Sequence, residues 1–138
     1  MYPLELVAPM TKDLTDFGFE SLKTPADVDG VLGQNEGTVL MVVNSVCGCA
    51  AANARPAAKM ALSNASKPDK AVTVFAGVDR EATAKAREYL LPYPPSSPAI
   101  ALFKDGQLVH MIERHHIEGR SAQMIAENLV QAMNAYCK

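Results

Sequence analysis

The stretch TVLMVVNSVCGCAAANARP, residues 38–56, decides the predicted fold of this chain. Its first part, residues 38–45, is continuously apolar and rich in β-branched side chains, which is typical of a central strand buried on both faces of a parallel sheet. Its last part begins an alanine-rich segment, residues 50–62, that predicts a helix kinked or capped at Pro56. Two cysteines separated by one glycine lie between them. The stretch therefore predicts a strand, a cysteine pair and a helix in direct succession.

The residues before this stretch predict two helices. Apolar residues at helical spacing indicate an amphipathic helix over residues 4–16. A second, short helix follows Thr24, because a threonine before Pro25 is a favourable way to cap and start a helix. We expect this helix to end by Gly33 or Gly37.

The residues after the stretch predict alternating elements and then a hairpin. In chain order they are a strand over 71–77, a helix over 79–91, strands over 98–103 and 107–112, and a helix over 120–136. Asp79 is the predicted cap of the first of these helices. Lys104, Asp105 and Gly106 join the last two strands and predict a tight antiparallel turn.

These elements give the order β-α-β-α-β-β-α, preceded by one or two N-terminal helices. The order predicts an α/β fold with a central mixed sheet, and residues 1–138 are interpreted as a single domain. The proline-rich segment 92–98 is too short to separate domains and is interpreted as a rigid loop. Reacting groups in open α/β sheets tend to lie at the carboxyl ends of strands, which is where the cysteine pair falls.

Composition narrows the role of the cysteines. The chain has 138 residues, of which 49% are hydrophobic, so it can bury a core without disulfide staples. Its net charge of −2 gives no basic face for nucleic acid, and no apolar run approaches the ~20 residues of a membrane span. The first residues lack the pattern of a signal peptide, so we expect a cytoplasmic protein. In such a compartment an odd number of cysteines favours free, catalytic or metal-bound thiols.

The spacing of Cys47 and Cys49 suits a labile disulfide. Two residues of extended chain reach further than a disulfide allows, so the bridge requires a bend at Gly48, which glycine permits. Cys47 lies at the predicted helix N-terminus, where backbone N–H groups and the helix dipole favour a thiolate. No cation occurs between Lys23 and Arg55, so the helix end is expected to carry most of the activation. Cys47 is therefore the predicted attacking thiol and Cys49 the resolving thiol.

Four segments together resemble one family. They are VNSVCGCAAANARPA, TVFAGVDREATAKAREY, PSSPAIALFK and HHIEG, and the similarity extends over essentially the whole chain. The sequence resembles the bacilliredoxin family, although Ala52 stands where relatives often have glycine. The resemblance implies a thioredoxin-like three-layer sandwich that removes bacillithiol from mixed disulfides on cytoplasmic client proteins. It implies no metal or organic cofactor, with bacillithiol as thiol co-substrate.

The resemblance also implies roles for individual residues. Cys47 would take bacillithiol from the client, and either Cys49 or a second bacillithiol would then release it. A recycling reductase would restore the pair. Pro98 would be the cis-proline that faces the redox pair, and the backbone beside Ser97 could pair with an extended substrate strand.

Other interpretations remain open at this point. The cysteines could be an inert buried pair, or could bind zinc together with His110, His115 or His116 without turnover. Adjacent histidines on or after a strand would point to opposite faces, so at most one of His115 and His116 would suit a common centre. A general reductase or isomerase of protein disulfides is the alternative enzyme.

Four further residues are weaker candidates. Asn44 could hydrogen-bond near the thiolate, or could serve only as a turn residue. Arg55 is interpreted as a structural partner, and Arg114 as a possible contact for the carboxylate of an anionic thiol. Cys137, next to last in the chain, is either a free thiol or a regulatory or intermolecular one.

Overall fold

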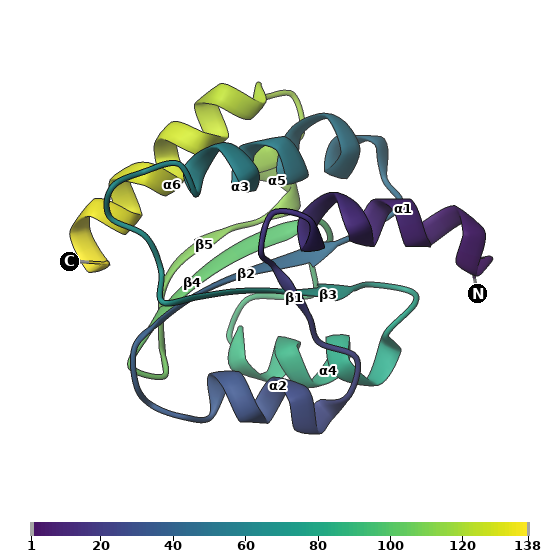
Figure 1. The fold of residues 1–138 in the computed structure, drawn as a ribbon, viewed down its shortest axis with the longest axis horizontal. Helices are drawn as coiled ribbons and strands as arrows, with labels where there is room; N and C mark the ends of the chain where they lie inside the picture. Colours follow the sequence, from purple (N-terminus) through teal and green to yellow (C-terminus); the bar gives the residue numbers. More distant parts are fainter. Residues whose placement is uncertain (1, 138) are drawn as a thin grey trace.

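The computed structural model describes residues 2–137, which form a five-stranded mixed sheet between two layers of helices (Figure 1). The elements in chain order are α1 (Leu4–Thr15), β1 (Glu20–Ser21), α2 (Pro25–Leu32), β2 (Thr38–Asn44), the π-helical η1 (Ala50–Ala54), α3 (Arg55–Ala61), β3 (Lys70–Phe75), α4 (Arg80–Tyr89), β4 (Ala99–Lys104), β5 (Gln107–Ile112), α5 (Arg114–Ile117) and α6 (Ala122–Tyr136). The strand order is β1-β3-β2-β4-β5. β1, β3 and β2 pair in parallel, whereas β4 pairs antiparallel with both β2 and β5.

β2 is the central strand, as its apolar sequence predicts. All seven of its residues are buried. Leu40 and Val42 belong to the core on one face of the sheet, and Met41 and Val43 to the core on the other. Because successive side chains of a strand point to opposite faces, a strand covered on both sides must be apolar throughout.

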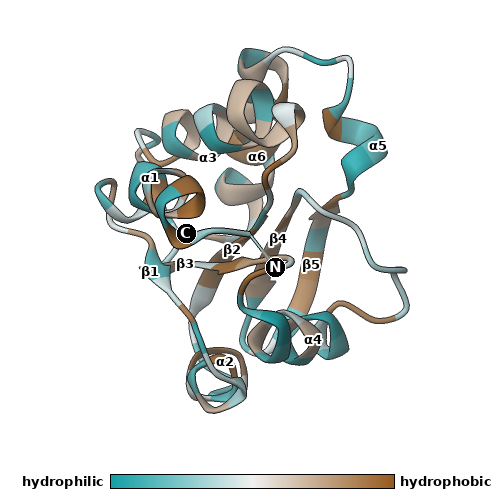
Figure 2. Ribbon diagram, turned by 90° about the vertical axis from the view of Figure 1, so that its right-hand side faces the viewer, coloured by the Kyte–Doolittle hydropathy of each residue, from teal (hydrophilic) through white to brown (hydrophobic). Residues whose placement is uncertain are grey.

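The two helical layers enclose these two cores (Figures 1 and 2). α1, α3, α5 and α6 cover one face, and α2 and α4 cover the other. In Figure 2 the sheet is seen between the layers, and α4 and α5 are largely hydrophilic in colour. The three-layer α/β sandwich implied by the sequence is confirmed. Within the described residues, no helix combines the length and the apolar character that crossing a bilayer requires.

Local signals for caps and turns were mostly correct. The Thr24 hydroxyl accepts a hydrogen bond from the Asp27 N–H, and the Asp27 carboxylate accepts one from the Thr24 N–H, which completes a capping box. In the β4–β5 turn, Asp105 and Gly106 have φ angles of 52° and 83°, the positive values that a type I′ hairpin needs. Asp79 occupies the N-cap position of α4, as predicted, but its side chain makes no capping hydrogen bond, so the predicted capping role was wrong.

Two short elements were not predicted. β1 has only two residues, too few for the alternation that reveals a strand, and it exists because Glu20 and Ser21 pair with β3 at the edge of the sheet. α5 is a single turn between β5 and α6. His115 and His116 were expected to lie on or after a strand, and the helical turn that contains them places Arg114 beside the cysteine loop.

The irregularity expected at Pro56 is present as a π-helical turn. Helical conformation begins at Gly48 and continues through η1 into α3. The Arg55 N–H donates to the Ala50 carbonyl, five residues back. Pro56 has no N–H to donate, and it lies in the first turn of α3, where that absence is tolerated.

Candidate active site

The cysteine pair lies just beyond the carboxyl end of β2. Cys47 and Cys49 form a disulfide, and their Cα atoms are 5.4 Å apart, within the range of about 4.4–6.8 Å that the bond requires. The Ala51 N–H donates to the Cys47 carbonyl at 3.3 Å, which makes Cys47 the residue at the start of the helical segment. The Cys49 N–H points back at the Cys47 Sγ, 3.3 Å away. The predicted junction of strand, cysteine pair and helix is therefore in place.

Gly48 shapes this loop differently from the expectation. Its backbone is helical, and a Cβ built on it would meet no atom within 4 Å. The bend that brings the cysteines together is thus one turn of ordinary helix, which any residue can adopt. The expectation that glycine is needed for the bend was wrong. Gly48 leaves the surface open above the disulfide instead.

The two cysteines occupy different surroundings. Cys47 lines an open pocket with a volume of about 330 Å³. Cys49 packs against the apolar core beneath α3 and α6. A substrate can therefore reach Cys47 from the pocket, whereas Cys49 does not line it.

Arg114 brings a positive charge to Cys47. Its Nη2 lies 3.2 Å from the Cys47 Sγ, and its Nη1 donates to the Ser97 carbonyl at 3.2 Å. Its Nε donates to the Glu118 carboxylate, and its backbone N–H donates to the Ser96 hydroxyl at 2.7 Å. A cation this close favours the thiolate over the thiol. The helix end was expected to carry most of the activation, and the fold adds to it a cation that the local sequence lacks.

The loop that carries Ser97 and Pro98 completes the rim of the pocket. The Ser97–Pro98 peptide bond is cis, as the resemblance implied, and Leu91–Pro92 is also cis. Ser97 lines the same pocket as Cys47. Its carbonyl accepts a hydrogen bond from Arg114, which leaves one further acceptor position on that oxygen for a substrate strand.

Asn44 is a structural junction beneath the cysteine loop. It is fully buried, its Oδ1 accepts hydrogen bonds from the Ser45 N–H and from Arg55 Nη1, and its Nδ2 donates to the Met10 carbonyl of α1. Arg55 is buried too and pairs with Asp13 at 3.1 Å. These contacts hold α1 against the end of β2, so Asn44 and Arg55 both position the loop from below.

The Asp13 carboxylate pairs with both positive charges of this network, those of Arg55 and Lys59. Lys59 Nζ lies 2.6 Å from its second oxygen. Burial alone raises the pKa of the Asp13 carboxyl, but the hydrogen bonds and charges of Lys59 and Arg55 outweigh it and hold the pKa below the ordinary value. Asp13 is therefore ionised and ties the N-terminal helix to α3.

Three residues near the site were missed by sequence reasoning. The Ser45 hydroxyl accepts the Cys47 N–H at 3.1 Å and fixes the start of the loop. Asn53 Nδ2 donates to the carbonyls of Ile117 and Arg120. These bonds join η1 to the last residue of α5 and to the loop that follows it. Arg87 of α4 lines the pocket beside Cys47. Ser45 and Asn53 flank the cysteines in the sequence, so they could have been predicted to lie near the site. Nothing in the sequence around Arg87 indicates that it lies there.

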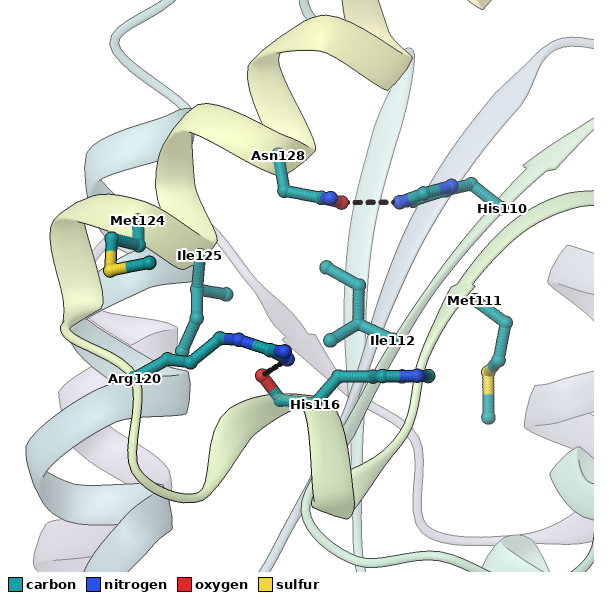
Figure 3. Close-up of a pocket in the computed structure, with 8 residues that line it drawn as sticks. All are labelled: His110, Met111, Ile112, His116, Arg120, Met124, Ile125 and Asn128. Atoms are coloured by element: carbon teal, nitrogen blue, oxygen red, sulfur yellow. Dashed lines mark hydrogen bonds between the residues drawn. The ribbon is translucent and has the colours of Figure 1, made fainter.

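None of the three histidines lines the pocket beside Cys47. His115 and His116 belong to α5 rather than to a strand, and their ring centroids are 4.0 Å apart, so the expected opposite orientation was wrong. Figure 3 shows a second cavity, of about 440 Å³, between β5, α5 and α6, where His110 contacts Asn128 and Arg120 Nη1 donates to the His116 carbonyl. Residues 2–137 contain no group of three or more metal-ligating side chains placed to hold an ion.

Cys137 lies at the opposite end of the sheet. It is 9% exposed and shares a small cavity with Gly37 and Thr38, at the start of β2, whereas Cys47 follows the end of that strand. Burial raises the pKa of the Cys137 thiol above its ordinary value. These features reduce its thiolate population, so the predicted regulatory role would need the C-terminal turn to open first.

Solved structures share this fold. Thioredoxin from Fasciola hepatica superposes with a TM-score of 0.59 at 18% identity, over 86% of this chain and 99% of that protein. Thioredoxin O2 from Arabidopsis thaliana in its oxidised state gives 0.59 at 20% identity, over 89% and 97%. The thioredoxin fold is therefore confirmed. The Cys-Gly-Cys disulfide therefore lies at the end of the central strand of a thioredoxin fold.

Sequence comparisons identify the family to which the chain belongs. The family model described as disulphide isomerase matches residues 2–137. A bacilliredoxin of Cytophaga hutchinsonii is 60% identical, with 94% of this chain and 95% of the relative aligned, and a bacilliredoxin of Salinibacter ruber is 56% identical, with 99% and 81% aligned. The chain therefore belongs to the bacilliredoxin family, as the sequence motifs indicated. Together with the thioredoxin fold, this makes the protein a thiol–disulfide oxidoreductase.

Proposed function

We propose that the protein removes bacillithiol from mixed disulfides on cytoplasmic client proteins. The observation that carries this proposal is the difference between the two sulfurs, because Cys47 borders an open pocket beside the Arg114 guanidinium and Cys49 packs against the core. An accessible thiol next to a cation suits attack on an external disulfide. A second thiol that packs against the core, within bonding distance of the first, suits release. The relatives named bacilliredoxin support bacillithiol as the thiol that is removed.

The reaction has two exchanges. The Cys47 thiolate attacks the bacillithiol sulfur, so that a Cys47–bacillithiol bond forms, the bond to the client cysteine breaks, and the client thiolate takes a proton from solvent. The Cys49 thiolate then attacks the Cys47 Sγ, the internal disulfide forms, and bacillithiol leaves as a thiolate. The client and bacillithiol gain two electrons, which the cysteine pair loses.

The cycle requires a thiol reductant to restore Cys47 and Cys49. A recycling reductase supplies two electrons to the internal disulfide, or a second molecule of bacillithiol releases the first as a symmetric disulfide before Cys49 reacts. The proposal includes no metal and no organic cofactor, because thiol–disulfide exchange needs only sulfur nucleophiles and proton transfer.

The test uses a client protein that carries bacillithiol on one cysteine. The reduced protein should release bacillithiol, Cys47→Ser should abolish release, and Cys49→Ser should accumulate a bacillithiol adduct on Cys47, detected by intact mass. Cys137→Ser is the matched control and should leave release unchanged. Full activity of Cys47→Ser would overturn the proposal. Faster reduction of insulin disulfides than of the bacillithiol adduct would instead favour a general protein disulfide reductase.

A further inference from the structure

Two separate helices each contribute an arginine to the pocket beside Cys47. It is formed by the cysteine loop, the β3–α4 loop, α4, the cis-proline loop, α5 and the N-terminal residues, and its lining residues are Tyr2, Ser45, Val46, Cys47, Ala76, Gly77, Arg87, Ser97 and Arg114. The described residues that line it include two arginines and no carboxylate. Arg114 is paired with Glu118 outside this lining, whereas Arg87 pairs with no carboxylate of the described residues, so an anionic group is the ligand that the pocket favours.

The two arginines differ in how their donors are used. Arg114 contacts Cys47, Ser97 and Glu118, so its Nε and both Nη atoms already have partners. Arg87 Nε is buried and makes no hydrogen bond within residues 2–137. A buried donor without a partner is destabilising. Arg87 is thus the arginine of the pocket that has a donor still unused.

We propose that Arg87 binds a carboxylate of the small thiol that Cys47 carries as its mixed disulfide. This inference rests on the proposed function and specifies its substrate as a thiol that bears a carboxylate. A planar guanidinium pairs with a carboxylate through two parallel hydrogen bonds, which fixes the orientation of the ligand as well as its charge. In this proposal Arg87 binds the carboxylate of the ligand, whereas Arg114 contacts the Cys47 sulfur that reacts.

The size of the pocket favours a small thiol over a client side chain as the source of the carboxylate. A volume of about 330 Å³ lies at the small end of the range typical of ligand sites. The Tyr2 ring lies over Gly77, 3.0 Å from where a Cβ would stand, and closes the side of the pocket near the β3–α4 loop. A ligand attached to the Cys47 sulfur would be directed into this space.

The test measures the stability of Cys47 adducts and needs no client protein or turnover. A Cys49→Ser protein is equilibrated with mercaptosuccinate, which has two carboxylates, or with 2-mercaptoethanol, which has none, each together with its own symmetric disulfide. Mass spectrometry of the peptide that contains Cys47 gives the two adduct equilibrium constants. Adding Arg87→Gln should lower the ratio of the mercaptosuccinate constant to the 2-mercaptoethanol constant by about tenfold, the value of one charge-assisted hydrogen bond.

Two more variants control this measurement. Arg80→Gln removes an exposed positive charge from the same helix and should leave the ratio unchanged. Arg87→Lys keeps the charge but loses the planar donors, so the ratio should fall by a smaller factor, about threefold, and this variant serves if Arg87→Gln does not fold. A wild-type ratio in either Arg87 variant overturns the proposal, as does an equal fall in Arg80→Gln.

A further pair of ligands separates the two sources of carboxylate. Peptides in which an aspartate or an asparagine adjoins the cysteine form adducts with Cys47 in the same assay. Arg87→Gln should change neither relative to the other, and selective loss of the aspartate peptide adduct would assign Arg87 to the client and overturn the proposal. Because the assay scores adduct stability alone, failure of bacillithiol release from clients would not alter its outcome.

Discussion

Arg114 Nη2 lies 3.2 Å from the Sγ of Cys47, although 67 positions separate the two residues in the sequence. The contact exists because α5 is a single helical turn that begins where β5 ends, beside the carboxyl end of β2. It gives the cysteine loop the cation that its own sequence lacks. The reactivity of Cys47 therefore depends on a residue of the C-terminal half of the chain.

Arg114→Gln should make reduced Cys47 less reactive near neutral pH. Loss of a cation within 4–6 Å of an acid disfavours its charged form by about 1–3 pH units. The midpoint of Cys47 alkylation against pH should therefore move upward by about one unit or more. Iodoacetamide labelling followed by peptide mass spectrometry measures it. Arg120→Gln, which removes a charge after α5, should leave the midpoint in place, and an unmoved midpoint in Arg114→Gln would contradict the assignment.

Gly48→Ala should still form the internal disulfide. The backbone at this position is helical and the space above it is open, so alanine is accommodated and favoured by up to about 1 kcal/mol. Thiol titration after mild oxidation, together with thermal unfolding, checks both points. Gly77→Ala is the contrasting variant. Its φ of 85° and the Tyr2 ring predict a loss of about 1–2 kcal/mol. Failure of Gly48→Ala to oxidise would restore a conformational role for this glycine.

Asp13→Asn should destabilise the protein at neutral pH and less so in acid. The folded pKa of Asp13 is below the ordinary 3.8, so its contribution to stability is present above that value and is lost as the pH falls through the folded pKa. At pH 7 we expect a loss of roughly 1–2 kcal/mol, because buried Arg55 loses its charged partner. Urea unfolding at pH 7 and below about pH 3.8 should show the difference from the native protein shrinking.

Asp16→Asn is the matched control for that measurement. Asp16 pairs with Lys12 on the exposed side of the same helix, and such pairs contribute about 0–1 kcal/mol. The two variants should therefore separate at pH 7. If Asp13→Asn were no less stable than Asp16→Asn, the network through Arg55 and Asn44 would not hold α1 in place.

Cys137 should be alkylated at least about tenfold more slowly than reduced Cys47 in the folded protein. Its thiol is buried and its pKa is raised, and both effects reduce the exposed thiolate that reacts. Labelling rates from peptide mass spectrometry measure the ratio, and the difference should vanish in urea. Equal native rates would show that the C-terminal turn opens readily and would revive a regulatory thiol at this position.

Sequence patterns were sufficient for the main elements and for the cysteine pair. The apolar run of β2, the Asp105–Gly106 turn and the Thr24 cap each follow from short-range physics, namely burial, backbone conformation and the hydrogen bonds of a helix end. The two-residue β1 and the one-turn α5 did not follow, because each is too short to show a periodic pattern and each also depends on a contact with a distant segment.

The sequence by itself determined that two cysteines stand at the end of a buried strand and at the start of a helix. Only the tertiary structure decided what surrounds them. Arg114, Arg87 and Ser97 come from three separate elements, and they meet at Cys47 because strand pairing and helix packing bring those elements to one end of the sheet. Local propensity acts over a few residues, whereas the charge around a sulfur is set by whatever the fold places within a few ångströms of it.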